Sequence, residues 1–262
     1  MPANHTFEGA IDELRIWYSE RSQTEIQANM FTALTGTETD LELYYDFEDG
    51  VAEANNSAVN TLTDLPGNHD ASLNNFLLTG TESNFVQGVC ITNAVSTNHS
   101  LDFDGTDDYI DLDAIPSSTN YSVEFWYNPT VARHNDRILS AIDATTSIYN
   151  VWINATKFCV STGPNGALVD ASTTDLVADT WYHIAFVRES PTQVGFYLNG
   201  VKEVNSITVV PELAFVDKQT LGQPFDSVVQ DLVIIPTAKL MNLEFGTDQF
   251  HNNKFWTICI QN

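Results

Sequence analysis

The chain has 262 residues, 43 % of them hydrophobic, so it can form one large β domain or two smaller domains with a substantial core. Ten basic residues stand against 35 acidic ones, and the formal net charge of -25 disfavours nucleic acids and anionic membranes as partners. No signal-peptide pattern and no run of about 18 apolar residues is present, so we expect no membrane insertion by this fragment.

The first part of the chain predicts a strand and then a helix. Residues 5–17 form a β-prone run. Ser22 and Glu25 have the spacing of a capping box, which predicts a short helix that ends near Met30. After a polar connector, residues 41–47 are aromatic and β-prone.

The remainder predicts short strands joined by turns. Residues 50–75 are rich in Asn, Ala, Thr and Asp, which favours loops with short edge strands. Asn199-Gly200 is a strong hairpin signal. Strands are expected at residues 100–103, 109–112, 121–128, 137–142, 148–153, 157–161, 181–188, 193–198, 202–209, 220–222 and 228–235, and a further one at 255–260. Many short strands and one helix near the N-terminus indicate an all-β sandwich or barrel.

Two distant stretches have similar sequences. FEGAIDELRI at residues 7–16 aligns without gaps with FDSVVQDLVI at residues 225–234. Self-similarity at long spacing indicates a tandem array, in which the chain would begin within the end of one module and continue through most of the next.

Several motifs occur in the order found in one known family. They are SLDFDGTDDYI at residues 100–110, YSVEFW at 121–126, TWYHIAFV at 180–187, FYLNG at 196–200 and IDELRIW at 11–17. Together they resemble laminin-G-like, concanavalin A-like jelly-roll domains. The stretch from residue 21 to residue 47 resembles the junction between successive modules of large bacterial surface proteins, so the parent is expected to be a tandem-repeat adhesin. The second copy of the closing strand departs from the family pattern at Gln230 and Val233, where the first copy has Asp12 and Arg15.

The resemblance implies an antiparallel two-sheet jelly-roll sandwich and three segments. Residues 1–40 would be the last strand and helix of a preceding laminin-G-like module plus a linker. Residues 41–240 would be the jelly-roll domain, and residues 241–262 a C-terminal tail or the start of the next segment.

Calcium is the cofactor that the chain favours. Carboxylate and amide oxygens lie in turn-rich segments, and hard cations take oxygen ligands from loops. The candidate ligands are Asp64, Asn68, Asp104, Asp107 and Asp108. Many domains of the resembled family hold a structural calcium ion. The alternative is that these residues only form turns.

A glycan site is the candidate for binding. Alternation along residues 121–128 and 148–154 places one set of side chains in the core and the other on the opposite face. The second set mixes indole rings with groups that bond hydroxyls. The candidate residues are Glu124, Trp126, Asn150, Trp152 and Tyr197. The alternative is that the tryptophans pack under a covering loop.

Catalysis is not expected. No run of alternating carboxylates occurs in a central strand, and Asp12-Glu13 and Asp107-Asp108 are adjacent pairs whose side chains should point to opposite faces. His183 lies within a predicted strand, where a structural role is favoured. The three cysteines show no CxxC spacing, so zinc is not expected.

These observations predict a non-catalytic binding or adhesion module of a large extracellular or cell-surface protein. Its partners would be a carbohydrate or a surface protein, together with neighbouring modules of the same chain. One alternative is a structural spacer in a stalk or filament. Another is a polysaccharide-degrading enzyme, which would need two carboxyl groups that face each other across a cleft.

Overall fold

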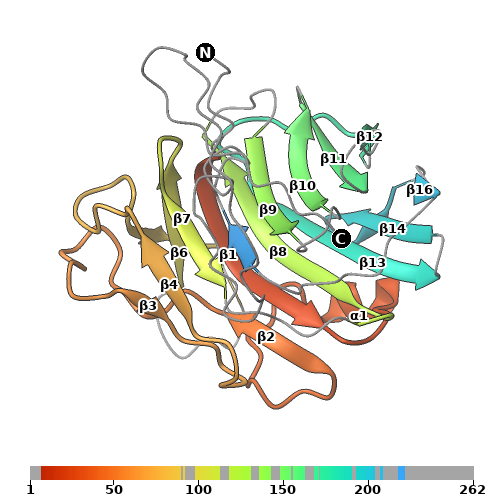
Figure 1. Ribbon diagram of the computed structural model, residues 1–262, viewed down its shortest axis with the longest axis horizontal. Coiled ribbons are helices and arrows are strands. Elements are labelled where there is room, and N and C mark those ends of the chain that lie inside the picture. The colour runs from red at the N-terminus through yellow and green to blue at the C-terminus, as the bar shows by residue number, and fades with distance from the viewer. Residues whose placement is uncertain are drawn as a thin grey trace, which may run out of the picture.

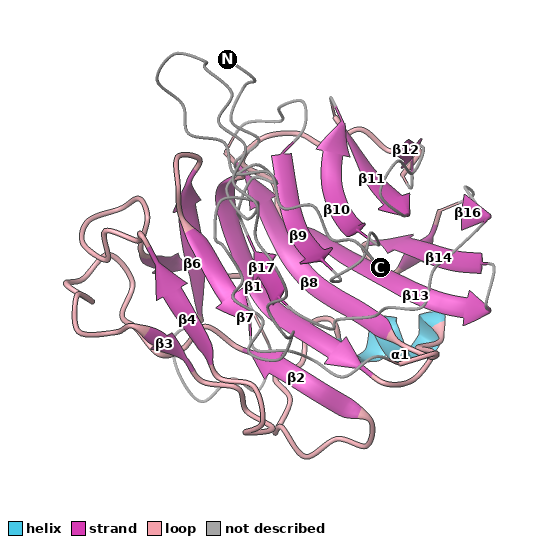
Figure 2. Ribbon diagram, viewed as in Figure 1, coloured by secondary structure: helices cyan, strands magenta, loops and turns pink. Residues whose placement is uncertain are grey.

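In the described part of the chain, two antiparallel β-sheets pack face to face and one helix lies against them (Figures 1 and 2). The computed structural model describes residues 7–89, 91, 98–112, 118–130, 136–142, 148–154, 156–162, 168–170, 172–190, 193–203, 207–208 and 218–221. Within this part of the chain, all strand pairings are antiparallel. The all-β sandwich with one helix near the N-terminus is therefore confirmed.

Among the described residues, the larger sheet has nine strands and the smaller has eight. In spatial order, the nine-stranded sheet contains β15 (Val201–Lys202), β14 (Gln193–Leu198), β13 (Tyr182–Ser190), β8 (Ser122–Pro129), β1 (Glu8–Trp17), β6 (His99–Asp104) and β5 (Phe85–Gln87), while β2 (Leu41–Tyr45) pairs with β1 and β16 (Ile207–Thr208) with β14. The eight-stranded sheet contains β12 (Leu168–Asp170), β11 (Lys157–Thr162), β10 (Ile148–Asn154), β9 (Asp136–Ile142), β17 (Lys218–Leu221), β7 (Tyr109–Leu112), β4 (Ala71–Asn74) and β3 (Thr61–Leu62).

Most of the predicted strands are present, and β7 and β14 have the expected bounds. The run expected at residues 202–209 contains two short strands, β15 and β16, instead of one. Strands β5 and β12 were not predicted, because three residues are too few to show an alternating pattern. The strands expected at residues 228–235 and 255–260 lie outside the described residues.

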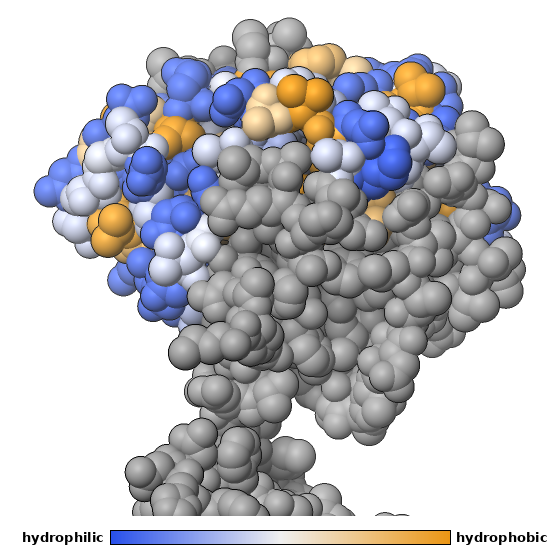
Figure 3. Space-filling model, turned by 90° about the horizontal axis from the view of Figure 1, so that it is seen from above, coloured by the Kyte–Doolittle hydropathy of each residue, from blue (hydrophilic) through white to orange (hydrophobic). Residues whose placement is uncertain are grey.

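The core lies between the two sheets. On β8, Val123, Phe125 and Tyr127 belong to the main buried cluster, as does Tyr121 just before the strand, in agreement with the predicted alternation. The other side chains of β8 point to the opposite side, which we call the outer face of the nine-stranded sheet. Figure 3 shows one face of the molecule, where the described surface is mostly hydrophilic and the hydrophobic residues form small separate groups.

Helix α1 (Gln23–Asn29) covers part of this outer face. It begins with the predicted capping box, in which the Ser22 side chain accepts from the backbone of Glu25 and the Glu25 side chain accepts from the backbone of Ser22. Ile26 is fully buried against β13 and β14. The side chain of Gln27 donates to the carbonyl of Gly200 at 2.7 Å. Within the described part of the chain, no helix is long and apolar enough to cross a membrane.

Strand β1 lies in the middle of the nine-stranded sheet, between β6 and β8. Together with α1 it is part of the same sandwich as the strands that follow. The division of the chain at residues 40 and 240, and the origin of residues 1–40 in a preceding module, stay predictions.

A β-bulge in β1 corrects one expectation. Asp12 pairs with Trp126 and Arg15 with Glu124, so β1 has one more residue than β8 between these two pairs. Glu13 takes the extra position with a left-handed φ of 55°. As a result, Asp12 and Glu13 both lie outside the core, whereas regular alternation placed them on opposite faces.

Candidate functional site

Glu124, one of the residues predicted to bind glycans, is sealed from solvent. It lies on the outer face of β8 and is 0 % exposed. Its carboxylate is 3.4 Å from Nε of Arg21 and 3.6 Å from Nε2 of His183. Arg21 in turn lies over the ring of Trp17, with 4.0 Å between the guanidinium carbon and the ring centroid. Glu124 therefore belongs to a buried charge cluster.

Trp126 and Tyr197 are covered by α1 and the segment after it. The indole Nε1 of Trp126 donates to the carbonyl of Met30 at 2.7 Å, and its ring centroid is 4.9 Å from that of Phe31. Tyr197 is buried in a small cluster with Ile26 of α1. Both side chains therefore pack beneath a covering segment. This is the alternative to a glycan site that the sequence left open.

The other two candidates, Asn150 and Trp152, lie on β10 in the eight-stranded sheet. The two sheets are separate layers, so the structure does not bring the five candidates together. A role for Asn150 or Trp152 in binding stays a prediction.

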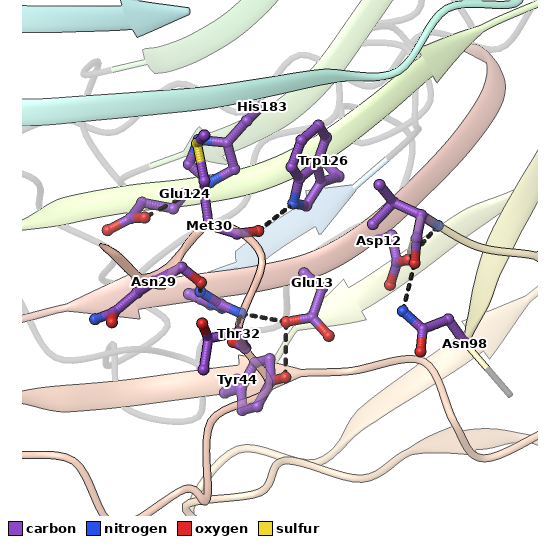
Figure 4. A network of polar contacts seen from close by, with 12 residues as sticks. Asp12, Glu13, Asn29, Met30, Thr32, Tyr44, Asn98, Glu124, Trp126 and His183 are labelled. Atoms are coloured by element: carbon purple, nitrogen blue, oxygen red, sulfur yellow. Dashed lines mark hydrogen bonds and ion pairs between the residues drawn. The ribbon is translucent and has the colours of Figure 1, made fainter. Parts of the chain in front are cut away.

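A layer of buried polar groups joins β1 to its cover (Figure 4). Arg15 forms an ion pair with Glu13, and it donates to the carbonyl of Asn29 at 2.9 Å. It also donates to the carbonyl of Thr32 at 2.8 Å. The hydroxyl of Tyr44 donates to Glu13 at 2.7 Å. These bonds connect β1 and β2 to the end of α1 and to the segment after it, so the layer holds this cover on the sheet.

Burial controls the protonation of this layer. It raises the pKa of Glu124, and it raises the pKa of Asp12 together with the negative charge of Glu13. Burial and then the charge of Arg15 lower the pKa of His183 to about 3. His183 is therefore neutral at pH 7 and closed to solvent, in agreement with the structural role expected of it.

A pocket of about 310 Å³ opens elsewhere on the outer face of the nine-stranded sheet. Ala10 of β1 pairs with Asp102 of β6 on one side and with Asn128 of β8 on the other. Trp181 continues this row one residue before β13. The lining residues are Ala10, Glu53, Thr81, Val86, Gln87, Asp102, Asn128, Thr130, Asp179 and Trp181. The small side chain of Ala10 leaves the space between its taller neighbours open.

The pocket combines an aromatic ring with groups that bond hydroxyls. Trp181 is partly exposed. The Oδ1 atom of Asn128 is buried and has no hydrogen-bond partner among the described residues. Asp102 accepts from the backbone N–H of Ser83 at 3.1 Å. Burial raises the pKa of Asp102 to about 7, against the hydrogen bond from Ser83 that lowers it, and the charge of Asp108 adds to the rise.

None of the five predicted glycan residues lines this pocket. Alternation did place Asn128 on the outer face, and Trp181 opens a predicted strand, so a weak signal was present. What the sequence could not show is that β6, β1 and β8 lie side by side in this register. Because β1 precedes β6 by about eighty residues in the chain, only the tertiary structure joins Asp102, Ala10 and Asn128.

Three of the five predicted metal ligands come together. One side-chain oxygen from each of Asp104, Asp107 and Asp108 lies within 4.8 Å of the others. Asp64 is not part of this group, and its carboxylate accepts from the backbone N–H groups of Tyr44 and Asn68. Asp64 therefore has a structural role in the β3–β4 turn, to which Asn68 contributes its backbone.

The acidic turn between β6 and β7 is well ordered by hydrogen bonds. Asp108 accepts from the backbone N–H of Asp104 at 2.9 Å and from the hydroxyl of Ser83 at 2.8 Å. Asp104 accepts from the backbone N–H of Thr106 at 2.7 Å. Burial and then the charges of the neighbouring aspartates raise the pKa of Asp108 to about 6.

Comparison with known proteins identifies the family. The sequence profile of the concanavalin A-like lectin/glucanases superfamily matches residues 104–235 of the 262-residue chain. The chain belongs to this superfamily. The superfamily match begins at the end of β6 and includes residues 225–234, but not β1.

Among solved structures, the chain is similar to domain 4 of AbnA, a GH43 extracellular arabinanase from Geobacillus stearothermophilus, in complex with arabinotriose. The identity is 17 %, the alignment covers 62 % of this chain and 78 % of that chain, and the TM-score is 0.45. No curated protein sequence matches the chain.

Proposed function

We propose that this protein is a non-catalytic carbohydrate-binding module. The observation that carries the proposal is the pocket on the outer face, where the ring of Trp181 lies in one row with Asn128 and Asp102. An aromatic ring can stack on the apolar face of a sugar, while amide and carboxyl groups bond its hydroxyls. Asn128 brings a buried acceptor that a sugar hydroxyl can satisfy.

The charge of the pocket narrows the ligand class. Its three acidic residues are Glu53, Asp102 and Asp179, and it has no basic residue among those that line it. The chain as a whole is also strongly acidic. Uronic acids and sulfated glycans would be repelled, so the proposed ligand is a neutral oligosaccharide.

Titration of the full chain with neutral gluco-, manno-, xylo- and arabino-oligosaccharides, followed by calorimetry, tests this proposal. Trp181→Ala should weaken binding about tenfold or more, because the stacking surface is lost. Ala10→Leu should block binding by filling the space between Asp102 and Asn128. Leu77→Ala, on an exposed residue outside the pocket, is the control and should leave binding unchanged.

The outcome also separates this proposal from its alternatives. The absence of binding to every neutral oligosaccharide tested would contradict sugar binding. Self-association of a chain that binds no sugar would favour a structural spacer. Binding that survives both Trp181→Ala and Ala10→Leu would place the sugar elsewhere, and Trp152→Ala would then test β10.

Glycoside hydrolysis is a second candidate, favoured by one observation. Asp102 has a pKa raised to about 7, as a general acid requires, and it shares the pocket with Glu53 and Asp179. Release of reducing ends from the neutral panel by the full chain, abolished in Asp102→Asn, would support hydrolysis. Tight binding without product would support the non-catalytic module.

Calcium at the β6–β7 turn is a further proposal. The carboxylates of Asp104, Asp107 and Asp108 lie close enough to share one hard cation, and backbone carbonyls and water would supply the rest of its six to eight oxygen ligands. Burial, and after it the charges of Asp104 and Asp107, raise the pKa of Asp108, and a bound cation would offset the second of these effects. Calcium would supply structural support for the turn, and its removal should lower the melting temperature.

The setting that we propose is a large exported surface protein with several such modules. The acidic composition and the similarity between residues 7–16 and 225–234 support it. In this setting the module would attach its parent to a carbohydrate or to a glycosylated surface protein.

A further inference from the structure

Strand β1 fills a slot in the centre of the nine-stranded sheet. On one side, Glu8 to Ile11 pair with β6 and Leu14 to Trp17 pair with β2, while on the other side residues between Gly9 and Trp17 pair with β8. Without a strand in this slot, β6 and β8 would each lose a backbone ladder along a buried edge. The slot therefore requires an occupant.

A second segment of the chain has the sequence to occupy it. Phe7, just before β1, and Ile11, Leu14 and Ile16 of β1 belong to the core. Their counterparts in the aligned stretch are Phe225, Val229, Leu232 and Ile234. All four counterparts are apolar. The superfamily match ends at residue 235, so it includes this second stretch and excludes β1.

The topology allows the second segment to reach the slot in the right direction. Strand β17 ends at Leu221, which pairs with Ile110 at the start of β7. Glu8, where β1 begins, pairs with Asp104, just before the turn that leads into β7. Leu221 and the start of β1 thus lie at the same end of the sandwich. The four residue steps from Leu221 to Phe225 span up to ~14 Å, enough for the ~10 Å between packed sheets.

We propose that the slot between β6 and β8 is a strand-exchange site, which binds residues 225–234 of the same chain in place of β1. These residues lie outside the described part of the chain. In the exchanged state these residues would run antiparallel to β6 and β8, as β1 does. The inference is independent of sugar binding, since it concerns the backbone edges of the slot and the core-facing side of its occupant.

The differences between the two stretches explain why β1 holds the slot. Gly9 has a φ of 141°, and a Cβ there would lie 2.3 Å from the carbonyl oxygen of Asn128, whereas the second stretch has Ser227. Arg15, which bonds the segment after α1, is replaced by Val233. Displacement of β1 would also carry α1 away. The displaced β1 could then fill the same slot in another copy of the chain.

Disulfide reporters in the full chain test the exchange. In a background with the native cysteines replaced by serine, Ala10→Cys with Asn128→Cys reports β1 in the slot, because these residues are direct cross-strand partners. Val228→Cys with Asn128→Cys reports the second segment at the same position. Gly9→Val with Ser227→Gly transfers the favourable residue from β1 to the second segment.

In the otherwise unaltered chain, the 10–128 link should form and the 128–228 link should not. In Gly9→Val/Ser227→Gly, the 128–228 link should replace it, within a folded monomer. Adding Leu232→Asp, at the counterpart of the fully buried Leu14, should abolish both the new link and the fold. The proposal is overturned if the 128–228 link fails to form, if it joins two chains, if it survives Leu232→Asp, or if Gly9→Val/Ser227→Gly is already as unfolded as the triple variant.

Discussion

Arg15 shows how single residues decide the structure of the outer face. It is 1 % exposed, and it satisfies two backbone carbonyls and the carboxylate of Glu13. A buried charge that loses its partner is strongly destabilising, whereas replacement of a whole pair by apolar groups is often tolerated. The role of Arg15 is therefore to neutralise Glu13 and to fix the segment after α1.

Arg15→Met should lower the free energy of unfolding by ~3–5 kcal/mol, because Glu13 is left buried without its cation. The double variant Arg15→Met/Glu13→Gln should recover part of this loss. Chemical denaturation of Arg15→Met, of Glu13→Gln and of the double variant measures the coupling energy between the two residues. Strict additivity of the two single effects would contradict a direct interaction.

His183 gives the protein a defined dependence on acid. Its pKa is lowered to about 3 in the folded state by burial and by Arg15, and the carboxylate of Glu124 lies 3.6 Å from its Nε2. Below pH 6.5, the unfolded chain gains a proton at this position and the folded chain does not. Stability from this residue is therefore lost as the pH falls from 6.5 towards 3, at about 1.4 kcal/mol per pH unit.

We expect His183→Gln to remove this contribution. Between pH 7 and pH 5, the wild type should lose ~2 kcal/mol more than the variant does. Urea denaturation of both proteins at the two pH values measures the difference. The buried carboxylates affect both proteins alike, so parallel pH profiles would contradict a neutral, buried His183.

At the scale of elements, α1 is held mainly by its packing. Ile26 is fully buried, whereas the capping residues Ser22 and Glu25 are exposed. Ile26→Ala should destabilise the protein by ~2–4 kcal/mol, and Ser22→Ala by only ~1 kcal/mol. Thermal unfolding of both variants ranks the two effects. A larger loss for Ser22→Ala would show that the cap, and not the packing, fixes α1.

Signals within a few neighbouring residues predicted individual helices, strands and turns. The arrangement of strands that are far apart in the chain could not be predicted in this way. The capping box at Ser22 and the hairpin at Asn199-Gly200 depend on residues within one turn, and both occur as expected. The bulge at Glu13 was not foreseen, although it shifts the alternation so that the core residues Ile11 and Leu14 are three positions apart instead of two. The pocket was missed for a different reason, since its row of residues depends on strand order.

At the scale of the whole molecule, the excess of negative charge lowers the stability of the folded chain. Thirty-five acidic residues stand against ten basic ones, so the folded chain repels itself and any added salt should stabilise it by screening. A calcium effect must therefore be separated from a salt effect. The β6–β7 turn provides the means, because Asp107 is exposed while Asp104 and Asp108 are engaged in hydrogen bonds within the turn.

At a calcium concentration of about a hundred times the dissociation constant, binding should add roughly 2.7 kcal/mol to the free energy of unfolding. Melting of the full chain with calcium, with EDTA, and with sodium chloride at matched ionic strength measures this gain. Asp107→Asn should abolish the response to calcium and keep the response to sodium chloride, since it removes one ligand and only one of many charges. Equal melting temperatures in calcium and in matched sodium chloride would show that the three aspartates hold no specific cation.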